Sequence, residues 1–491
     1  MEVTEKQIID DYNKLKICIS TYINKKKFSD ACTLIRRAAQ LMYSTNLIYY
    51  DNYLEEALHT IGREIICEKG APSSCIGKNN RVVFYDYFVL DNRGLTEQYL
   101  NALANSNHEI LFIGNFNDCS KEIITKLNSN NIKKVMVPKL NDIDTTQFLY
   151  ETINQFSPSI IISHTAPWDV CGLMCQIPFK DPCKKFLINI TDHAFWIGKT
   201  FFDFFFEFRD YGFNISRDYR EIEESRLLKL PYYPIINKNI PFSGFDFPYQ
   251  GKKIIFSGGS TYKISGSNKF FEIAKHILDK HEDTIFLFLG NGDSCDINNF
   301  IIKNKYQNRF FFRNERKDIF EVFKHCYLYI NTYPLIGGLM TQYACVAGKL
   351  PMTLNDEHDP CNDIYELMNE HFNINLQFKN IDELNAEVDN YIEHPDLLFD
   401  QSKKIANAIM SESYFNELLL YYLDNPTNKL PVTKYHIDIN KFAQTYISRY
   451  NSNLYTYYHT LLQRDFKLLL IFKKHILKYA ILIGKKLLRI I

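Results

Sequence analysis

The sequence predicts an α/β protein that contains two doubly wound parallel sheets, each covered by helices on both faces. The chain has 491 residues, whereas a single hydrophobic core stops growing at roughly 250 to 300 residues. Short apolar runs alternate with amphipathic stretches, which is the pattern of parallel strands buried on both faces. A segment rich in proline, glycine and aromatic residues, 231–251, interrupts this pattern and divides the runs into two series.

Residues 1–75 precede both series and are predicted to form a helical region. Apolar residues recur there at helical spacing, with almost no glycine or proline over residues 1–68. Packing against the following lobe is the simplest role for these helices. The opening residues are charged from Glu2 onward and lack the apolar stretch of a secretory signal, so we expect a cytoplasmic protein.

The first series of apolar runs predicts a Rossmann-like lobe over residues 76–235. Its strand candidates are RVVFYDYFVL, EILFIG, KKVMVP, PSIIIS, KFLINIT and DFFFEF. The second series predicts a similar lobe over residues 236–426. Its strand candidates are KKIIFSGG, TIFLFLG, RFFFR, YLYIN and LPMTL. Residues 427–463 are predicted to form tyrosine-rich helices that pack back on the core.

The last segment, residues 464–491, predicts a basic amphipathic tail. Eight Lys or Arg residues stand against one Asp and are interleaved with Leu, Ile and Phe. No uncharged run approaches the roughly 20 residues that span a bilayer. The pattern favours a helix, from Arg464 to Ile491, that lies on the anionic inner face of the cell membrane. The alternative is a helix docked on the protein or on a partner chain.

Charge and cysteine content argue against several classes. Lys plus Arg and Asp plus Glu number 57 each, so the overall charge does not indicate a nucleic-acid partner. The 12 cysteines are scattered, which is typical of a reducing compartment. Cys171, Cys175 and Cys183 form the tightest cluster, between His164 and His193, but zinc-type ligand pairs are usually closer than this. We therefore expect no metal site.

Ligands of parallel α/β sheets bind at the carboxyl ends of the strands, where loops and helix N-termini converge. In the second lobe, glycine-rich turns follow two strands, and glycine lets the backbone approach a phosphate group. The residues predicted to hold a nucleotide at these strand ends are Gly258, Gly259, Ser260, Lys263, Gly290, Asn291 and Arg313. Each turn also has a plain interpretation as a connection.

The most specific segment of the second lobe, 331–351, predicts a strand, a Pro- and Gly-rich loop, a short helix and another strand. Gly337 and Gly338 lead into the helix, so bare N–H groups and the positive dipole end form a site suited to a diphosphate. Tyr333 lies in the same loop. Thr341 and Gln342 are predicted to add side-chain donors. A purely structural loop is the alternative.

Two strand ends of the first lobe deliver a histidine and a carboxylate. His164 is followed by Asp169, and Asp192 directly precedes His193. A reaction that activates a hydroxyl needs a base, and either residue type serves within hydrogen-bond reach. Asp192 or His193 is the preferred candidate, with His164 and Asp169 as the next choice. A His193 ring that ties its loop to the backbone is the competing structural interpretation.

Two further turns of the first lobe are expected at the same edge of its sheet, beyond the carboxyl ends of the strands. Asp91–Gly94 places a glycine after the first strand of the lobe. Glu207, Arg209 and Asp210 follow the last strand candidate of this series. For these three residues a solvated surface turn is the favoured interpretation.

The order of strand and loop motifs in the second lobe resembles the donor lobe of GT-B glycosyltransferases. A strand ending in Gly-Gly, a strand ending in Gly-Asn-Gly, and a Tyr-Pro-x-x-Gly-Gly loop carry this resemblance over residues 250–360. It implies a GT-B fold and a nucleotide-diphosphate sugar as donor substrate, with no other cofactor and usually no metal. Many retaining members carry two glutamates where this chain has Leu335 and Tyr343, which slightly favours inversion. Residues 191–212 also resemble bacterial capsule and surface-glycan glycosyltransferases.

These features together predict a glycosyltransferase that moves a sugar from a nucleotide-sugar donor to an acceptor hydroxyl. A glycan or lipid-linked acceptor in surface polysaccharide synthesis is favoured, because membrane binding by the tail would concentrate the enzyme beside a lipid-borne substrate. The alternatives are a cytosolic protein glycosyltransferase whose N-terminal helices hold the target, a non-catalytic GT-B scaffold protein, and a sugar-nucleotide epimerase.

Overall fold

The computed structural model describes residues 2–67, 80–89, 95–116, 121–128, 131–237, 239–368, 374–452, 454–462 and 466–487. Three features named from the sequence lie outside these residues. They are the end of the N-terminal helical region at 68–75, the glycine turn at Asp91–Gly94, and both ends of the basic tail, at Arg464 and at residues 488–491.

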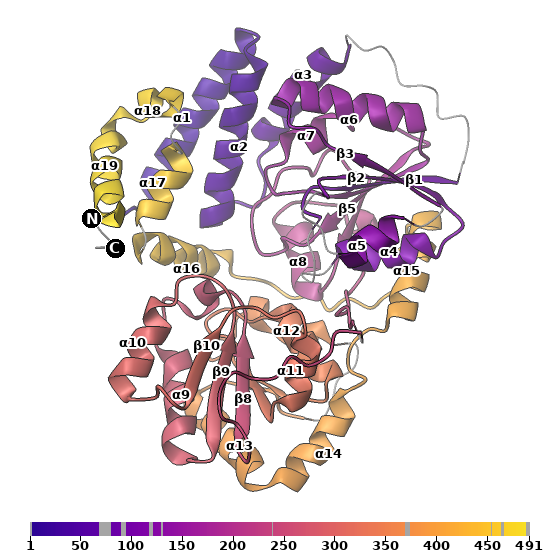
Figure 1. Cartoon of the computed structure of the whole chain (residues 1–491). Helices are drawn as coiled ribbons and strands as arrows, with labels where there is room; N and C mark the ends of the chain where they lie inside the picture. Colours follow the sequence, from indigo (N-terminus) through magenta and orange to yellow (C-terminus); the bar gives the residue numbers. More distant parts are fainter. Residues whose placement is uncertain are drawn as a thin grey trace. The chain divides into compact units, whose positions relative to one another are not determined.

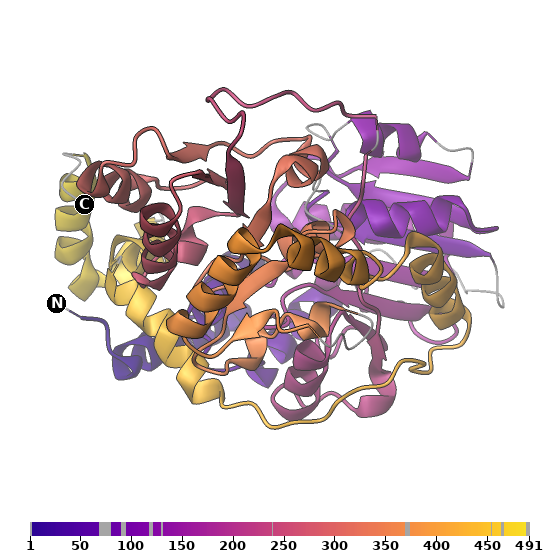
Figure 2. The same cartoon turned by 90° about the horizontal axis from the view of Figure 1, so that it is seen from below.

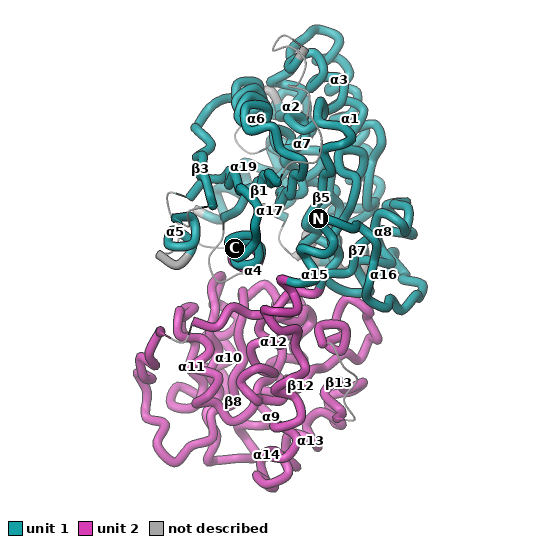
Figure 3. The backbone as a smooth tube through the Cα atoms, turned by 90° about the vertical axis from the view of Figure 1, so that its right-hand side faces the viewer, with its two compact units in different colours: residues 1–91, 99–230, 417–491 teal, residues 92–98, 231–416 magenta. Residues whose placement is uncertain are grey.

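The chain folds into two compact units (Figure 3). Unit 1 comprises residues 1–91, 99–230 and 417–491. Unit 2 comprises residues 92–98 and 231–416. Each unit contains one parallel sheet with helices on its faces, as the sequence predicts.

Unit 1 is built on a seven-stranded parallel sheet with the order β3-β2-β1-β4-β5-β6-β7. The strands are β1 Arg81–Asp86, β2 Glu109–Gly114, β3 Ile132–Met136, β4 Ile160–His164, β5 Lys184–Asn189, β6 Phe204–Glu207 and β7 Leu227–Lys229. The first six are the predicted strands. The seventh was not predicted, because an edge strand of three residues is too short to show a pattern.

Helices cover both faces of this sheet (Figure 1). They are α1 Glu5–Asn24, α2 Phe28–Thr45, α3 Asn52–Cys67, α4 Thr96–Ala104, α5 Lys121–Leu127, α6 Asp142–Phe156, α7 Val170–Met174, α8 Asp210–Asp218 and α15 Glu412–Asp424. In β1, Val83 and Tyr85 join the core beneath α2, α3 and α6. Phe84 faces the other way, with its ring centroid 6.0 Å from that of Tyr99 on α4. The strand is buried on both faces, which explains its continuous apolar sequence.

The C-terminal helices return to the N-terminal helices within unit 1 (Figure 2). They are α16 Ile439–Ser452, α17 Leu454–Leu462, α18 Phe466–Ile471 and α19 Lys473–Leu487. His475 of α19 and Tyr457 of α17 each lie 2.8 Å from the Asp11 carboxylate of α1, and all three residues are buried. The tail is therefore docked on the protein. Among the helices in the described ranges, none has the length and apolar content needed to cross a membrane.

Unit 2 is built on a six-stranded parallel sheet with the order β10-β9-β8-β11-β12-β13. The strands are β8 Lys253–Gly258, β9 Thr284–Leu289, β10 Phe310–Arg313, β11 Leu328–Ile330, β12 Pro351–Leu354 and β13 Gln377–Phe378. The first five match the predicted strands. The sixth is a two-residue edge strand that the sequence pattern does not reveal.

The helices of unit 2 sandwich its sheet. They are α9 Lys269–Lys280, α10 Cys295–Asn304, α11 Ile319–His325, α12 Gly338–Val346, α13 Ile381–Glu393 and α14 Pro395–Ile405. Phe270 of α9 packs edge-on against Phe286 of β9, on one face of the sheet. Phe323 of α11 packs edge-on against Phe256 of β8, on the other face. Both sheets are thus doubly wound, which confirms the predicted fold class.

Candidate functional site

The order of strands places a topological switch point in each sheet. In unit 1 the order in which strands are added to the sheet reverses between β1 and β4, and in unit 2 it reverses between β8 and β11. Ligands of open parallel sheets bind at such points, beyond the carboxyl ends of the strands.

His164 and Asp86 occupy the switch point of unit 1. His164 ends β4, Asp86 ends β1, and Nδ1 of the ring lies 3.0 Å from Oδ1 of the carboxylate. Both side chains are buried. The same Asp86 oxygen accepts hydrogen bonds from the backbone N–H groups of Phe88 and Val89. The pair therefore shapes the turn after β1 from inside the protein, beneath the solvent-accessible edge.

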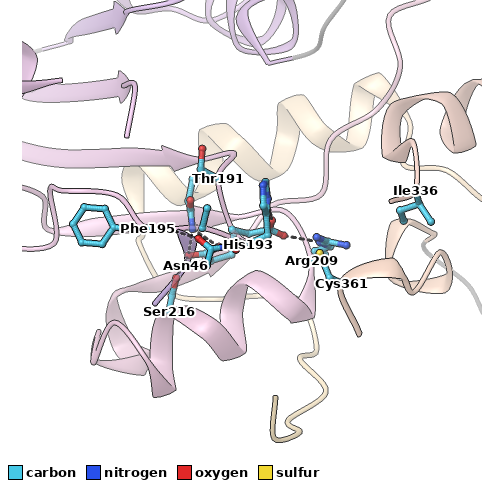
Figure 4. A network of polar contacts seen from close by, with 12 residues as sticks. Asn46, Thr191, His193, Phe195, Arg209, Ser216, Ile336 and Cys361 are labelled. Carbon is cyan, nitrogen blue, oxygen red and sulfur yellow. Dashed lines mark hydrogen bonds and ion pairs between the residues drawn. The ribbon is translucent and has the colours of Figure 1, made fainter. Parts of the chain in front are cut away.

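Asp192 and His193 follow β5, the neighbour of β4, and they contact each other. Figure 4 shows His193 near Arg209. His193 Nδ1 lies 3.2 Å from Asp192 Oδ1, and Arg209 donates from Nε to Oδ2 at 2.6 Å. Burial alone would raise the pKa of Asp192, but the Arg209 guanidinium and the hydrogen bonds from His193 and Arg209 lower it to about 2. The carboxylate is therefore ionised at neutral pH and holds the His193 ring, whose side chain is 33% exposed.

Asp169 lies apart from this pair, at the start of α7. One carboxylate oxygen accepts the Gly172 N–H at 2.9 Å, as an N-cap does. The other accepts the hydroxyl proton of Tyr85 at 2.8 Å. Burial raises the pKa of Asp169. The structure thus gives the cap of α7 to Asp169 and brings Asp192 and His193 together.

The residues after β6 are interior residues, so the expected solvated turn is wrong. Glu207, Arg209 and Asp210 are all buried. Asn189 of β5 donates to both oxygens of Glu207 at 2.9 Å, and Ser216 of α8 donates to one of them at 2.5 Å. This turn is buried because α8 covers it. Gly212 has no side chain, so α8 can lie close to the ends of both β5 and β6. A Cβ at Gly212 would lie 2.6 Å from the Glu207 carboxylate.

Burial gives Glu207 a pH-dependent effect on stability. Burial raises the pKa of Glu207 to about 7 against the opposing charge of Arg220, whereas a Glu in an unfolded chain titrates near pH 4.3. Between these values the folded state binds more protons, so its stability falls as the pH rises from about 4 to about 7. Relative to Glu207→Gln, the wild type should lose about 3 kcal/mol across this window. Urea unfolding at several pH values tests this, and a constant difference between the two proteins would contradict it.

In unit 2, glycines allow the ends of β8 and β9 to touch. The Gly259 N–H donates to the Leu289 carbonyl at 2.9 Å. A Cβ at Gly290 would lie 1.8 Å from the Gly259 carbonyl oxygen, so no other residue fits there without movement. Gly259 has a φ of +139°, which disfavours any side chain. Thr261 N–H donates to the Asn291 carbonyl at 2.9 Å and extends the contact beyond the strands.

Asn331, at the end of β11, folds the loop that leads into α12. Its Oδ1 accepts the N–H groups of Thr332 and Gly337 at 3.0 and 2.9 Å. Its Nδ2 donates to the hydroxyls of Thr341 and Thr353 at 2.8 and 3.2 Å. One buried amide therefore closes the loop on itself and fixes where the helix begins.

The first turn of α12 reaches the carboxyl edge of the sheet. Thr341 donates its backbone N–H to Gly337, so the preceding N–H groups of the first turn have no partner within the helix. Gly338, Leu339 and Met340 are all partly exposed. Together with the helix dipole, such groups offer the geometry and charge that suit an anion.

Two lysines border this helix start. Lys263 donates its amine to the Ile336 carbonyl at 2.7 Å and so ties the turn after β8 to the loop before α12. Tyr333 donates its hydroxyl to Asp356 at 2.8 Å, and Lys269 forms an ion pair with the same carboxylate. The turns after β8 and β11 are thus joined into one surface.

Other predicted residues lie away from the helix start or face inward. Thr341 and Gln342 are buried, and their side chains donate to the backbone carbonyls of Gly337 and Tyr232. Arg313, 40% exposed, pairs with Asp246 at 2.7 Å. Ser260 precedes the short 3-10 helix Thr261–Ile264 and accepts the Lys263 N–H on its carbonyl.

Several residues that build the two sites were not singled out from the sequence. They are Asn46, Arg220, Lys269 and Asp356. Glu207 and Arg209 were expected in a surface turn, and Asn331 was given no role of its own within the segment 331–351. Each acts through a partner distant in sequence, which local patterns do not reveal. The sequence offered one signal for Arg209 and Asp210, which follow an apolar run. Charged residues are seldom buried without partners, so their place beside a buried strand indicates that, if buried, they are paired.

The sequence matches no family model and no curated protein. In three dimensions the chain is similar to Alr3699/HepE of Anabaena in complex with UDP and glucose, with a TM-score of 0.53, 12% identity, and coverage of 70% of this chain and 99% of that one. A glycosyltransferase of Rickettsia africae gives a TM-score of 0.50 and 13% identity, with coverage of 70% and 99%. An O-GlcNAc transferase mutant of Thermobaculum terrenum gives 0.51 and 11% identity, with coverage of 90% and 84%.

At these identities the likeness concerns the fold. The first two matches cover nearly the whole of the other chains, and both of the parallel sheets described above belong to this architecture. The chain therefore has the GT-B fold of glycosyltransferases, as its strand and loop motifs predict.

Proposed function

We propose that this chain is a glycosyltransferase that transfers a sugar from a nucleotide-diphosphate donor to an acceptor hydroxyl. The observation that carries the proposal is the start of α12, where Asn331 holds the loop so that bare N–H groups lie at the switch point of unit 2. A diphosphate is the anion that such a helix start suits best in this kind of sheet. UDP is the preferred nucleotide, because HepE, which shares the fold, was crystallised with it.

Unit 1 would supply the base. His193 is partly exposed, so it can meet an acceptor hydroxyl, and the ionised Asp192 holds its ring through Nδ1. Arg209 keeps Asp192 ionised at 2.6 Å. Such a base would serve an inverting transfer, in which the acceptor oxygen attacks the anomeric carbon directly. The nucleoside diphosphate then leaves with the electrons of the broken bond.

A thermal-shift screen with UDP, GDP, CDP, ADP and TDP tests donor binding. A ligand that binds only the folded state raises Tm. At a concentration of 100 times Kd, such a ligand adds about 2.7 kcal/mol to the free energy of unfolding. We expect UDP to give the largest shift. The shift should persist in EDTA, since the donor site is proposed to work without a resident metal. Equal shifts with all five nucleotides would contradict the preference for UDP, and no shift with any of them would overturn the proposed donor site.

The acceptor is proposed to be a lipid-linked glycan of surface polysaccharide synthesis, reached by contact with the inner face of the membrane. In the docked tail, Phe472 and His475 are buried against the rest of unit 1. The opposite face of α19 is exposed. On that face Leu477 is 72% exposed and Ile481 50% exposed, among exposed lysines of α19. Apolar and basic side chains on one helix face suit an anionic bilayer surface.

Vesicle sedimentation tests this contact. The double variant Leu477→Glu and Ile481→Glu should lose binding to vesicles that contain anionic lipid while its Tm stays near the wild-type value, because both side chains are exposed. Ile302→Glu, which changes an isoleucine that is 65% exposed on α10, serves as the matched control. Equal binding of the double variant and the control would contradict the membrane contact.

A protein acceptor is the second candidate. It is favoured by the match to the O-GlcNAc transferase, which covers 90% of this chain against 70% for HepE. A transfer assay with labelled donor separates the candidates, because label extracted into organic solvent indicates a lipid-linked acceptor and label precipitated with protein indicates the alternative. Donor binding without transfer to either fraction would favour a non-catalytic scaffold. Release of free nucleotide with an epimerised sugar would indicate an epimerase.

A further inference from the structure

The N-terminal helices hold the loop that carries His193. We propose that Asn46, at the end of α2, is a positioning residue for His193, an inference that rests on the proposed role of His193 as the base. It assigns a role in the proposed reaction to a helical region for which packing is the simplest role that the sequence indicates. Three side chains anchor the segment 191–200, and two of them, Asn46 and Glu55, come from the N-terminal helices. Figure 4 shows Asn46 beside His193 and Phe195.

The Asn46 side chain forms hydrogen bonds with the backbone on both sides of Ala194. Its Nδ2 donates to the His193 carbonyl at 2.8 Å, and its Oδ1 accepts the Phe195 N–H at 3.3 Å. The residue is 1% exposed and has the left-handed conformation of a helix C-cap, with φ of 51°. Asn is one of the few residues that tolerate this conformation. The amide therefore acts as a neighbouring strand would, with one donor and one acceptor.

Arg220 grips the same loop from the other side. Its Nη2 donates to the carbonyls of Thr191, Asp192 and Ala194 at 3.1, 3.0 and 2.6 Å. The guanidinium is fully buried and lies 4.8 Å from the centroid of the Trp196 ring. Asn46 and Arg220 together hold the backbone before and after His193.

Glu55 of α3 holds the downstream end of the segment. Its carboxylate accepts the N–H groups of Gly198, Lys199 and Thr200 at 2.9, 2.8 and 2.8 Å. His59, one turn further along α3, lies 2.9 Å from the Thr200 hydroxyl. Helices α2 and α3 thus provide a rigid support for the loop.

This support matters because the His193 side chain is itself one-third exposed and is not fixed by packing on all sides. Its direction follows from its backbone, and a base displaced by about 1 Å can lose up to about 100-fold in rate. Asn46 is the anchor nearest to His193 that belongs to the N-terminal helices. It touches the backbone of the loop and none of the residues proposed to contact the donor.

Asn46→Gly is the test variant, because glycine keeps the left-handed C-cap and removes only the side chain. Ser157→Gly is the matched control, since Ser157 is the left-handed C-cap of α6, with φ of 53°. Asn46→Asp keeps the acceptor for Phe195 and removes the donor to His193. The readouts are Tm, kcat, KM for the donor, and the ring Cε1–H signal of His193 in protein labelled at histidine, identified by its loss in His193→Gln.

We expect Asn46→Gly to shift or broaden the His193 ring signal and to lower kcat by about tenfold with KM for the donor nearly unchanged. For the ring signal and for kcat, Asn46→Asp should give values between those of the wild type and Asn46→Gly. Ser157→Gly should leave both the ring signal and kcat at wild-type values. An unchanged ring signal in Asn46→Gly would overturn the inference, whatever the rate. If the signal moves and kcat stays constant while His193→Gln is also fully active, positioning holds and the proposed base is wrong. If His193→Gln is inactive in that case, Asn46 is not a positioning residue.

Discussion

Replacing His193 by Gln should lower kcat for sugar transfer by about 10³-fold and leave the UDP-induced rise in Tm unchanged. Glutamine preserves a polar side chain beside Asp192, but it cannot accept a proton from an acceptor hydroxyl at neutral pH. The proposed donor site is built from residues of unit 2, which this substitution leaves unchanged. Initial rates at saturating donor, together with thermal shifts, measure the two effects separately.

Asp192→Asn provides the companion measurement. The variant removes a carboxylate whose pKa of about 2 keeps it charged, and it leaves the buried Arg209 guanidinium without its partner at 2.6 Å. We expect a loss of about 3 kcal/mol in stability as well as a lower rate. If Asp192 acts through His193, the double variant should be little slower than His193→Gln alone.

His108→Gln is the matched control for these variants. His108 is a half-buried histidine that directly precedes β2, at the amino edge of the same sheet, and its ring bonds to Ser106 at 3.1 Å. Its replacement should leave the rate unchanged. If His193→Gln transfers sugar at a rate within about twofold of the wild-type rate, His193 is not the base. The buried His164 would then be the next candidate.

The fold was predictable because its signals are local. Most of the strands in the described residues are apolar runs bounded by turns, such as β9, whose residues Thr284–Leu289 are all buried. The two strands that were not predicted, β7 and β13, have three and two residues and lie at sheet edges. Their pairing depends on the preceding strands and not on any pattern of their own.

The site was predictable only where its chemistry resides in consecutive residues. Gly337 and Gly338 precede a helix in the sequence itself, and Asp192 adjoins His193. By contrast, Arg220 reaches the loop of His193 from more than 25 positions along the chain, and Asn46 from 147 positions. Nothing in the neighbourhood of an asparagine indicates which distant backbone group it will bind. Glu207 was misread for the same reason, since its burial follows from the close approach of α8.

Replacing Asn331 by Ala should destabilise unit 2 by about 3 kcal/mol and abolish the UDP-induced rise in Tm. The substitution leaves the N–H groups of Thr332 and Gly337 without their acceptor inside the protein, and each such group costs about 1 to 3 kcal/mol. The loop before α12 then loses the bond that fixes its start. Denaturant unfolding and thermal shifts with UDP measure both consequences.

Asn331→Asp separates stability from binding, because aspartate keeps an acceptor oxygen for the N–H groups of Thr332 and Gly337 and adds a negative charge at the start of α12. The helix dipole favours that charge, so we expect a smaller loss of stability than in Asn331→Ala. The same charge repels a diphosphate, so UDP binding should still be lost. Asn380→Ala, which removes the N-cap of α13 in the same unit, should cost about 1 kcal/mol and retain the UDP shift. A full UDP shift in Asn331→Asp would show that the nucleotide binds elsewhere, because a carboxylate and a diphosphate cannot share one helix start without repulsion.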